Sequence, residues 1–483
     1  MDWKTLSHLP LEEQRGIQNE KVKKFFQHKL PYAPYYRELF EKNHIAFEDI
    51  NNVDDLQRIP FTTKQDIAPT ADDPGKTRQL ILQPDETLIK KYATKAELAK
   101  ILGMKITGQD VKAKLEWEYK PIHIHFTTGR TALPTAFGYS ARDIITLKEA
   151  GKRLLDVSGA DRNQFGINAF PYAPHLAFWL GAFAMQELGI TSIQTGGGKI
   201  MGTRKIIDAI ESTKAGLATF IPGYAYHLFR QAAHEKRDFS KLQTIIFGGE
   251  RVSPGLREKT KELLRELGNY NPTILATYAF TESKTAWIQC SEDSGYHLYP
   301  DMEYFEVIDR DGNCVPEGNP GELVVTSLEW RGTVVVRYRT GDMTQGIEYR
   351  PCPNCGRTVP RIHPDIQRTS EIKEFHLTKI KGELINLNEF YPLLSSRHDI
   401  EEWQVEIKKE NNDPYSLDQL VIHIAPKTNA TYDQVAQQIQ KMILDETGVR
   451  ATMHQVPLDE LLTNLGMETE LKEKRIIDNR PKI

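Results

Sequence analysis

The sequence predicts an α/β protein with a large layered N-terminal domain, an antiparallel β meander inside it and a small α+β C-terminal domain. Three observations lead to this fold class. The chain has 483 residues, too many for one ordinary compact core. Short β-rich runs alternate with helical stretches from about residue 122, as in layered α/β domains. Beyond about residue 368, a strand–strand–helix–strand pattern has the length of a separate domain, so we expect domains at residues 1–368 and 369–483.

The segment before the first predicted strand is expected to be largely helical. Residues 11–30 place apolar side chains at helical spacing among lysines and glutamates. The prolines of residues 31–34 end that helix, because proline lacks a backbone N–H. Thr63 is a candidate N-cap for a short helix that follows it. Residues of about 80–119 are rich in lysine, glutamate and leucine, so we expect a helical insertion of two amphipathic helices there.

The layered domain is predicted from alternating strands and helices. The expected strands are residues 122–127, 165–170, 216–220, 244–247 and 273–277. The expected helices between them are residues 141–158, 204–212 and 254–267. The meander, at about residues 302–345, has expected strands at 305–308, 322–326 and 333–338. In the C-terminal domain we expect strands at 403–408, 420–425 and 450–456 and a helix at 432–447.

Composition and charge exclude several classes of protein. Hydrophobic residues make up 39% and charged residues 27%, which is the balance of a globular protein in water. The formal net charge of −4 gives no reason to expect a nucleic-acid partner. Residues 1–31 lack the apolar core of a signal peptide, and no segment reaches the roughly 18 to 20 apolar residues that span a bilayer. Four cysteines are too few for a disulfide framework. We therefore expect a cytoplasmic enzyme without a membrane partner.

A polar loop follows the first expected strand. Residues 125–135 read HFTTGRTALPT and combine hydroxyl side chains with a glycine. Backbone N–H groups and hydroxyls in such a loop can surround phosphate oxygens, and the negative charge of phosphate strengthens each contact. Loops of this composition are more often plain turns, so this stretch alone does not decide between a turn and a phosphate site.

Three further motifs stand in a specific order along the chain: residues 278–282 (YAFTE), 337–342 (RYRTGD) and 472–478 (KEKRIID). Together with the polar loop and with residues 32–37 (YAPYYR) and 59–64 (IPFTTK), they resemble the adenylate-forming (acyl-CoA synthetase) superfamily, and within it the phenylacetate–CoA ligase-like branch. The resemblance covers essentially the whole chain. It implies an enzyme that uses ATP to activate a carboxylic acid as an acyl-adenylate, transfers the acyl group to coenzyme A, and carries a small mobile C-terminal lid.

The resemblance also implies roles for individual residues. The residues that the resemblance implies bind the nucleotide are Thr127, Thr128, Gly129, Thr131, Gly248, Gly249, Glu250, Tyr278, Thr281, Asp342 and Arg368. Of these, Asp342 is expected to accept hydrogen bonds from the ribose hydroxyls of ATP or AMP. Glu282 is expected to hold Mg²⁺, an ion that prefers oxygen ligands. Lys472 is expected to stabilise charge at the carboxylate and the α-phosphate as pyrophosphate leaves. Each of these three residues, taken singly, also fits a purely structural role.

The chain departs from the family pattern at three places. The family loop has a glycine and a lysine where this chain has Ala132 and Leu133. We hypothesise that Arg130 supplies the catalytic charge directed at the phosphates, because a guanidinium can bind two phosphate oxygens at once. Leu471 stands where a glycine commonly precedes the catalytic lysine, and the hinge reads QRTSE at residues 367–371. The changes at Leu471 and at the hinge lie where the resemblance implies that the C-terminal lid moves after adenylation. They therefore bear on the formation of the thioester.

The cysteines predict a metal site. Cys290 is followed by His297, and Cys352 and Cys355 form a tight knuckle at about residues 350–357. A Cys-x-x-Cys pair lets two thiolates reach one ion, and a second pair of ligands completes a tetrahedral site. The four residues are therefore predicted to bind a structural Zn²⁺. The alternative is a pair of buried thiols and an unrelated surface histidine.

Residues 170–179 are aromatic and lie where the family builds its acyl pocket, although a core helix entered through prolines explains them equally well. An aromatic or apolar acid is therefore the expected substrate. Three alternatives stay open: transfer of the acyl group to an amine, an enzyme that stops at AMP transfer, and a degenerate nucleotide-binding protein with a regulatory role. Members of the branch are often dimers, so a homodimer is a further hypothesis, although no segment marks an interface.

Overall fold

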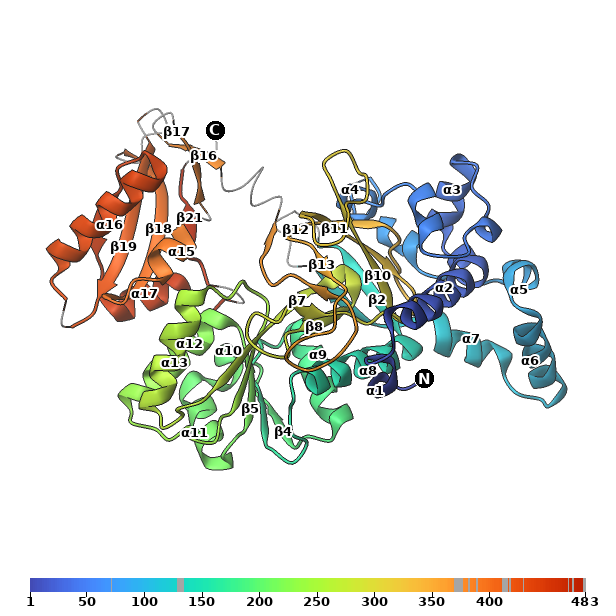
Figure 1. Ribbon diagram of the computed structural model, residues 1–483, viewed down its shortest axis with the longest axis horizontal. Coiled ribbons are helices and arrows are strands. Elements are labelled where there is room, and N and C mark those ends of the chain that lie inside the picture. Colours follow the sequence, from blue (N-terminus) through green and yellow to red (C-terminus); the bar gives the residue numbers. More distant parts are fainter. Residues whose placement is uncertain are drawn as a thin grey trace. The chain divides into compact units, whose positions relative to one another are not determined.

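The computed structural model describes residues 1–70, 72–127, 134–368, 377–380, 383–387, 390–410, 416, 418–428, 430–467, 469–470 and 473–480. These residues form two compact units (Figure 1). Unit 1 comprises Met1–Asn163, Ala173–Thr191 and Thr277–Ile366, and unit 2 comprises Gln164–Tyr172, Ser192–Ala276 and Gln367–Ile483. Unit 2 contains both the C-terminal residues and part of the layered domain. The domain boundary expected at residue 368 stays a prediction.

Unit 1 contains the N-terminal helices. They are α1 (Trp3–Leu6), α2 (Leu11–His28), α3 (Pro34–Lys42), α4 (Lys64–Ile67), α5 (Glu86–Tyr92), α6 (Lys95–Ile106), α7 (Val111–Tyr119), α8 (Ala141–Val157) and α9 (Leu176–Leu188). Short 3-10 helices are η1 (Leu30–Tyr32), η2 (Phe47–Asp49), η3 (Asp54–Arg58), η4 (Lys76–Leu80) and η5 (Thr281–Ser283). The helix predicted from residue 11 is confirmed, and it buries Val22, Phe25 and Phe26. The cap predicted at Thr63 is also confirmed, because Thr63 and Asp66 form a reciprocal capping box at the start of α4.

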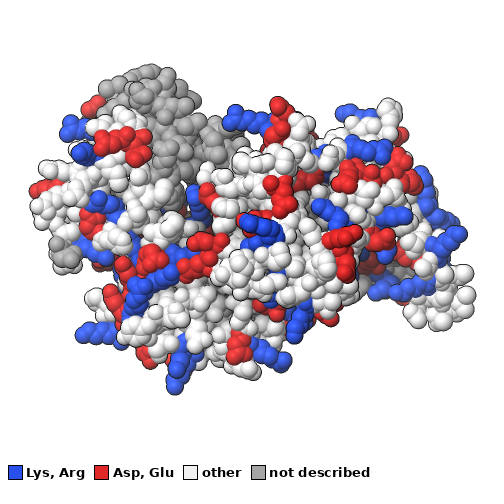
Figure 2. Space-filling view, in the orientation of Figure 1, with Lys and Arg blue, Asp and Glu red and all other residues white. Residues whose placement is uncertain are grey.

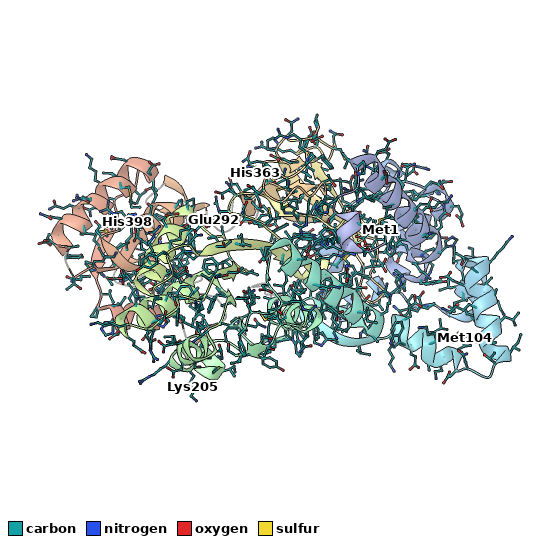
Figure 3. All side chains as sticks on the ribbon, turned by 60° about the horizontal axis from the view of Figure 1, so that its bottom comes forward. Met1, Met104, Lys205, Glu292, His363 and His398 are labelled. Atoms are coloured by element: carbon teal, nitrogen blue, oxygen red, sulfur yellow. The ribbon has the colours of Figure 1, made fainter. Side chains whose placement is uncertain are left out.

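The helical insertion differs from the prediction. It consists of α5, α6 and α7, three helices and not two, because Asp85, Thr94 and Asp110 each accept a hydrogen bond from a backbone N–H at the start of one of them. Neither α5 nor α6 has a buried residue, so these helices lack the buried apolar face expected of amphipathic helices. Met104 of α6 lies at the outer edge of the insertion (Figure 3).

The sheets of unit 1 are small and antiparallel. β1 (Pro121–Phe126) pairs with β2 (Ala136–Ser140). The meander contains β10 (Glu303–Ile308), β11 (Gly321–Ser327) and β12 (Tyr338–Thr344). A further sheet has the order β13 (Ile347–Glu348), β14 (Arg361–Ile362) and β9 (Tyr296–His297). After β14 the chain continues into β15 (Ile366–Arg368) and leaves unit 1.

The third strand of the meander starts later than the predicted residues 333–338, because β12 begins at Tyr338. Arg337 has a left-handed backbone conformation with φ of 44°, which interrupts an extended run. The valines before it are buried, but their hydrogen bonds go elsewhere, as shown by Val336, whose N–H donates to the Tyr36 hydroxyl at 2.8 Å. The apolar run is therefore a buried connection and not a strand.

Unit 2 contains a parallel sheet with the strand order β4–β3–β5–β6–β7. Its strands are β3 (Gly166–Asn168), β4 (Ser192–Gln194), β5 (Leu217–Phe220), β6 (Thr244–Phe247) and the first half of β7 (Thr273–Phe280). The associated helices are α10 (Gly198–Met201), α11 (Thr203–Thr213), α12 (Pro222–His234) and α13 (Pro254–Glu266). Phe220, Phe229 and Ile245 are completely buried in their common core, and the predicted α/β alternation is confirmed. The second half of β7 pairs with β8 (Thr285–Ile288) in unit 1.

The C-terminal residues of unit 2 form a second sheet with the order β20–β19–β18–β21. The elements here are β16 (Leu377–Ile380), β17 (Glu383–Asn386), α15 (Phe390–Ser395), β18 (Ile400–Lys409), β19 (Asp418–Pro426), α16 (Tyr432–Thr447), β20 (Thr452–Gln455), α17 (Leu458–Leu465) and β21 (Ile476–Asp478). The predicted strands and helix are confirmed. β21 was not predicted, because it is a short strand formed by parallel pairing with β18, with Ile476 opposite Val405.

On the face shown in Figure 2, basic and acidic side chains are interspersed over the described residues, in line with the net charge of −4. In the described part of the chain, no helix is both long enough and apolar enough to cross a membrane.

Candidate active site

The loops at the carboxyl ends of the parallel strands in unit 2 lie along one edge of the sheet. Gly248, Gly249 and Glu250 follow β6, and Pro222 follows β5. The two loops are joined, because the Gly248 N–H donates to the Phe220 carbonyl at 3.1 Å. Gly249 has a φ of +85°, a conformation that glycine adopts readily, so the chain turns sharply as it leaves β6. Ligands of open α/β sheets bind beyond the carboxyl ends of the strands, which is where the structure places this predicted nucleotide-binding segment.

In unit 1, a hydrogen bond joins the end of β7 to the meander. The Tyr278 hydroxyl donates to Asp342 Oδ2 at 2.7 Å, and both side chains are buried. The Asp342 N–H donates to the Thr340 hydroxyl at 3.0 Å, which fixes the backbone that carries the carboxylate. The two predicted nucleotide-binding residues are thus brought together, and Tyr278 sets the orientation of the Asp342 carboxylate.

A second hydrogen bond joins the same elements. Thr281 and Glu282 lie in η5, directly after β7, and Glu282 Oε1 accepts a hydrogen bond from the Tyr338 hydroxyl at 2.9 Å. Tyr338, Thr340 and Asp342 all have buried side chains, and the pairing of β12 with β11 shifts register between Arg339 and Met343, where Gly341 has a φ of 73°. The sequence alone indicated no role for Tyr338. Its place in the RYRTGD motif, which also contains Asp342, was the signal that could have identified it.

The two arginines of the RYRTGD motif hold the meander together. Arg337 Nε and Nη2 donate to the two oxygens of Glu306 at 3.1 and 2.9 Å, and Arg337 Nη1 donates to the Ile59 carbonyl at 2.7 Å. Arg339 Nε donates to Glu322 at 3.0 Å. Ile59 is the first residue of the IPFTTK stretch. The hydrogen bond from Arg337 therefore brings this early stretch into contact with the RYRTGD motif.

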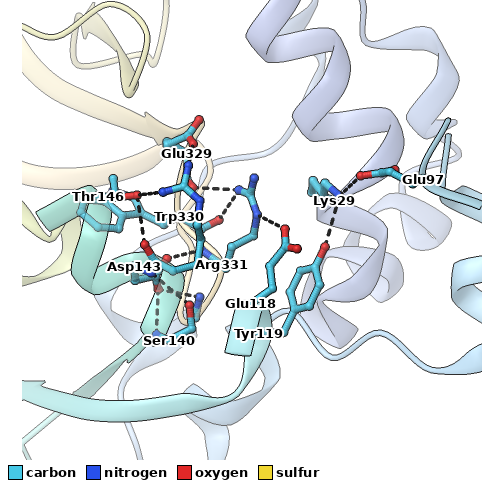
Figure 4. Close-up of polar contacts among 12 residues, drawn as sticks. Lys29, Glu97, Glu118, Tyr119, Ser140, Asp143, Thr146, Glu329, Trp330 and Arg331 are labelled. Atoms are coloured by element: carbon cyan, nitrogen blue, oxygen red, sulfur yellow. Dashed lines mark hydrogen bonds and ion pairs between the residues drawn. The ribbon is translucent and has the colours of Figure 1, made fainter. Parts of the chain in front are cut away.

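Lys284 forms a fully buried ion pair two residues after Glu282. Its Nζ lies 2.9 Å from Asp143 Oδ2, and both side chains are inaccessible to solvent. Asp143 also accepts hydrogen bonds from the backbone N–H groups of Ser140, Arg331 and Gly332 (Figure 4). These donors offset the free-energy cost of removing the Asp143 carboxylate from water. The pair therefore anchors the end of η5 to α8, a role that no sequence motif indicated.

Only the base of the polar loop belongs to the described residues. The Thr127 N–H donates to the Thr135 carbonyl at 3.0 Å, and the Thr135 N–H donates to the Thr127 hydroxyl at 3.2 Å, which closes the loop at its two ends. Arg368 is the last residue of β15, and its side chain is not described. The predicted site residues that lie outside the described part of the chain are Thr128, Gly129, Arg130, Thr131 and Lys472.

The part of the predicted acyl-pocket segment that belongs to unit 1, from Ala173 onward, is attached to β1. The Phe126 N–H donates to the Pro174 carbonyl at 2.8 Å, and His175 Nδ1 lies 2.9 Å from the Phe126 carbonyl. Further along the segment, the Trp179 ring packs edge-on against His123 with ring centroids 4.8 Å apart. The described residues 174–179 are therefore fixed to the strand that leads into the polar loop.

The cysteines and the histidine singled out in the sequence come together in unit 1. The ligand atoms of Cys290, His297, Cys352 and Cys355 all lie within 4.8 Å of one another. Cys290 Sγ is 3.6 Å from Cys352 Sγ, and Cys355 Sγ is 3.3 Å from His297 Nε2. Two sulfurs bound to one zinc at about 2.3 Å in tetrahedral geometry lie roughly 3.8 Å apart, so this donor set fits the ion. His297 Nδ1 lies 3.3 Å from the Ile288 carbonyl, which directs Nε2 toward the sulfurs.

A family model described as "AMP-binding enzyme" matches residues 56–329, which is more than half of the chain. The chain belongs to the AMP-binding enzyme family. The match includes the polar loop, the Gly248–Glu250 segment and the end of β7 with Tyr278 and Glu282. It confirms the resemblance to the adenylate-forming superfamily, and the curated relatives named below, to which the chain is similar, are phenylacetate-coenzyme A ligases.

Curated relatives of this AMP-binding enzyme extend over nearly the whole chain. Phenylacetate-coenzyme A ligase of Thermus thermophilus is 24% identical over 98% of this chain and 98% of its own length. The enzyme of that name from Escherichia coli is 23% identical over 97% of this chain and 96% of its own. Among solved structures, 2-hydroxyisobutyryl-CoA ligase in the postadenylation state has a TM-score of 0.76, with 21% identity over 99% of this chain and 92% of its own. This structural likeness establishes the adenylate-forming ligase fold.

Proposed function

We propose that the protein is an AMP-forming acid–CoA ligase. It activates a carboxylic acid with ATP as an acyl-adenylate and then transfers the acyl group to the thiol of coenzyme A. The Tyr278–Asp342 hydrogen bond carries the proposal, because it links the family-matched strand β7 to a buried carboxylate that can accept hydrogen bonds from ribose hydroxyls. The names of the relatives that match over the whole chain, all phenylacetate-coenzyme A ligases, support the same activity.

In the first half-reaction, a carboxylate oxygen attacks the α-phosphorus of ATP and pyrophosphate leaves. Asp342 orients the ribose, and Lys472 stabilises the charge that develops between the carboxylate and the α-phosphate. Glu282 has one oxygen engaged by Tyr338 and offers the other to Mg²⁺. When bound, Mg²⁺ neutralises part of the phosphate charge. In the second half-reaction, the thiol of coenzyme A attacks the acyl carbonyl carbon, and AMP leaves.

Arg130 is our candidate for the phosphate-directed cation, because the chain has Leu133 where the family has a lysine. A guanidinium can bind two phosphate oxygens and so replace an ammonium. The variant Arg130→Ala should raise the KM for ATP, whereas Arg130→Lys should retain part of the binding. An ATP KM that is the same in Arg130→Ala as in the wild type rejects this role.

We infer an aromatic or apolar acid as the substrate, with phenylacetate the first to test. The support is the aromatic segment at residues 174–179 beside β1, together with the names of the curated relatives. A panel of aromatic and medium-chain acids should be screened for acid-dependent release of pyrophosphate, with and without coenzyme A. We expect a coenzyme A thioester in the mass spectrum of the product.

Other products of that screen would indicate the alternative functions. An amide formed when an amine is supplied would identify an amide ligase, and an adenylate that persists in the presence of coenzyme A would identify an enzyme that stops at AMP transfer. Failure to exchange labelled pyrophosphate into ATP with any acid would favour a degenerate nucleotide-binding protein. The buried Asp342 and Glu282 favour the enzyme over that reading.

We propose that Cys290, His297, Cys352 and Cys355 hold a structural zinc ion. Four protein ligands leave no open position for a substrate, so the ion would stabilise the fold and take no part in the reaction. Protein purified without chelators should contain about one zinc per chain, and Cys355→Ser should lose it. Cys314, an exposed cysteine outside the cluster, provides the matched control, because Cys314→Ser should keep its zinc. Wild-type protein without zinc, and with Cys352 and Cys355 freely reactive, would reject the site.

The cytoplasmic location and the homodimer stay predictions. Size-exclusion chromatography with light scattering measures the oligomeric state directly.

A further inference from the structure

Helix α6 (Lys95–Ile106), in the helical insertion of unit 1, is apolar in composition but exposed in the structure. Seven of its twelve residues are alanine, leucine, isoleucine or methionine, yet none of the twelve is buried. Leu102 is 60% exposed and Ile106 is 77% exposed. Single exposed apolar residues are common, but a helix that is apolar over most of its surface is normally covered. α6 lies at the outer end of the insertion (Figure 1), so only another molecule can cover its outward side.

The exposed apolar and glycine residues of α6 fall on one face of the helix at 3.6 residues per turn. They are Ala96, Ala99, Leu102, Gly103 and Ile106, here called the α6 stripe. Ile101 and Met104 point away from the stripe and are partly shielded from solvent. The twelve residues of the helix give it a length of about 18 Å, so the α6 stripe is long and narrow.

Cationic side chains border the α6 stripe. Lys100 and Lys105 lie on opposite sides of it, Lys95 lies at its N-terminal end, and all three are exposed. Glu97, the single acidic residue of α6, points toward the rest of unit 1, where its Oε1 lies 2.5 Å from Lys29 Nζ (Figure 4). The border of the α6 stripe therefore has three lysines and no carboxylate.

The remaining acidic side chains of the insertion leave these lysines uncompensated. All four glutamates of α5, α6 and α7 form ion pairs with other lysines or arginines. Within the described part of the chain, Lys95, Lys100 and Lys105 themselves form no ion pair. The net charge of −4 conceals this local positive charge, because it averages over the whole chain.

An anionic lipid surface matches both the apolar and the cationic part of this face. If the stripes of two copies of the chain paired about a twofold axis, each copy would bring three lysines to the same contact, and like charges would meet. A stable complex with another protein buries roughly 800 Å² on each partner, more than one face of so short a helix offers. In a bilayer, the apolar side chains enter the boundary of the acyl chains and the lysine side chains extend to the lipid phosphates.

We propose that the α6 stripe, with Lys95, Lys100 and Lys105, is a peripheral docking site for an anionic lipid membrane. The site is independent of the proposed reaction, because α5, α6 and α7 contain no residue assigned to it. The apolar and the cationic parts act together, since either one alone gives only weak, reversible binding. The expectation of no membrane partner rested on the absence of a spanning segment, and it therefore applies only to insertion across the bilayer.

The test is sedimentation of the intact protein with lipid vesicles. The vesicles consist of phosphatidylcholine alone, or of phosphatidylcholine with about 30 mol% phosphatidylserine, which supplies the anionic surface. We expect the protein to bind the anionic vesicles and to bind phosphatidylcholine vesicles weakly. About 0.5 M salt should release it, because salt screens the lysine contacts. These measurements use the wild-type protein and so do not depend on the folding of any variant.

Two double variants separate the two parts of the site. Leu102→Gln with Ile106→Gln removes the large apolar side chains, and Lys100→Gln with Lys105→Gln removes two charges. Each double variant should lower the partition coefficient for anionic vesicles about thirtyfold, as expected for two large apolar side chains or for two lysines at an anionic surface. No residue of α6 is buried and glutamine is a good helix former, so both variants should unfold in urea as the wild type does.

Matched controls change the same kinds of side chain elsewhere. Lys23→Gln with Lys24→Gln removes two exposed charges from α2, and Tyr270→Gln removes an exposed aromatic ring from unit 2; both should bind as the wild type does. Absence of binding to anionic vesicles, equal binding to both kinds of vesicle, or wild-type binding by both double variants overturns the proposal. Light scattering without lipid tests the second copy: a dimer that Leu102→Gln with Ile106→Gln converts to a monomer would assign the α6 stripe to that copy and overturn the lipid site.

Discussion

Glu303 on β10 is buried in unit 1 and gives the stability of the protein a specific pH dependence. Its Oε1 accepts hydrogen bonds from Trp287 Nε1 at 2.8 Å and from the Tyr299 N–H at 3.0 Å, whereas its Oε2 has no hydrogen-bond partner among the described residues. Burial, only partly offset by these two hydrogen bonds, raises the pKa of Glu303 to about 8. The fold therefore favours the neutral carboxyl group.

In the unfolded chain the Glu303 carboxyl has an ordinary pKa of 4.5. Because the folded pKa is raised, the stability that the neutral form contributes is fully present below pH 4.5 and is lost as the pH rises to about 8. Each pH unit in this range lowers the free energy of unfolding by about 1.4 kcal/mol, which gives about 5 kcal/mol in total. Glu303→Gln stays neutral at every pH. Its stability relative to the wild type should therefore rise by about 5 kcal/mol across this range.

The assay is urea unfolding of both proteins at pH values from about 5 to about 8, followed by tryptophan fluorescence, because Trp287 contacts the altered side chain. Glu13→Gln, at an exposed position of α2, is the control and should differ from the wild type by less than about 0.5 kcal/mol at each pH. A difference between Glu303→Gln and the wild type that stays constant over the whole range would show that Glu303 is ionised in the folded protein, and would refute the reasoning.

Three further predictions concern the other buried charges. Asp342→Asn should raise the ATP KM in acid-dependent pyrophosphate release about tenfold to a hundredfold, because hydrogen bonds to a charged acceptor contribute about 1.5–3 kcal/mol; an unchanged KM contradicts the ribose role. Lys284→Met should lower the free energy of unfolding in urea by about 3–5 kcal/mol, because the buried Asp143 loses its cation, and Asp143→Asn added to it should restore part of the loss. Burial lowers the pKa of Lys259 to about 8 from 10.5, so the folded protein gains stability as the pH rises through that interval. Lys259→Met should be about 3 kcal/mol more stable than the wild type near pH 7, by a margin that shrinks above about pH 8; a margin independent of pH would contradict the lowered pKa.

Local sequence signals predicted much of the fold. The strand expected at residues 244–247 and the helix expected at 432–447 coincide with β6 and α16, because hydrophobic periodicity is a local property of the chain. Local signals failed where tertiary contacts decide the outcome. The valines before Tyr338 look like a strand, yet the left-handed Arg337 and the hydrogen bond from Val336 to Tyr36 make them a buried connection.

For the site, the sequence by itself determined which motifs are present, their order along the chain and the family that this order indicates. Only the tertiary structure decided how the motifs are held. Tyr278 meets Asp342 across 64 positions of sequence, and Tyr338 meets Glu282 across 56. The physical reason is that such contacts depend on strand register and on the burial of one face of each strand, and neither is encoded in the residues of a single motif.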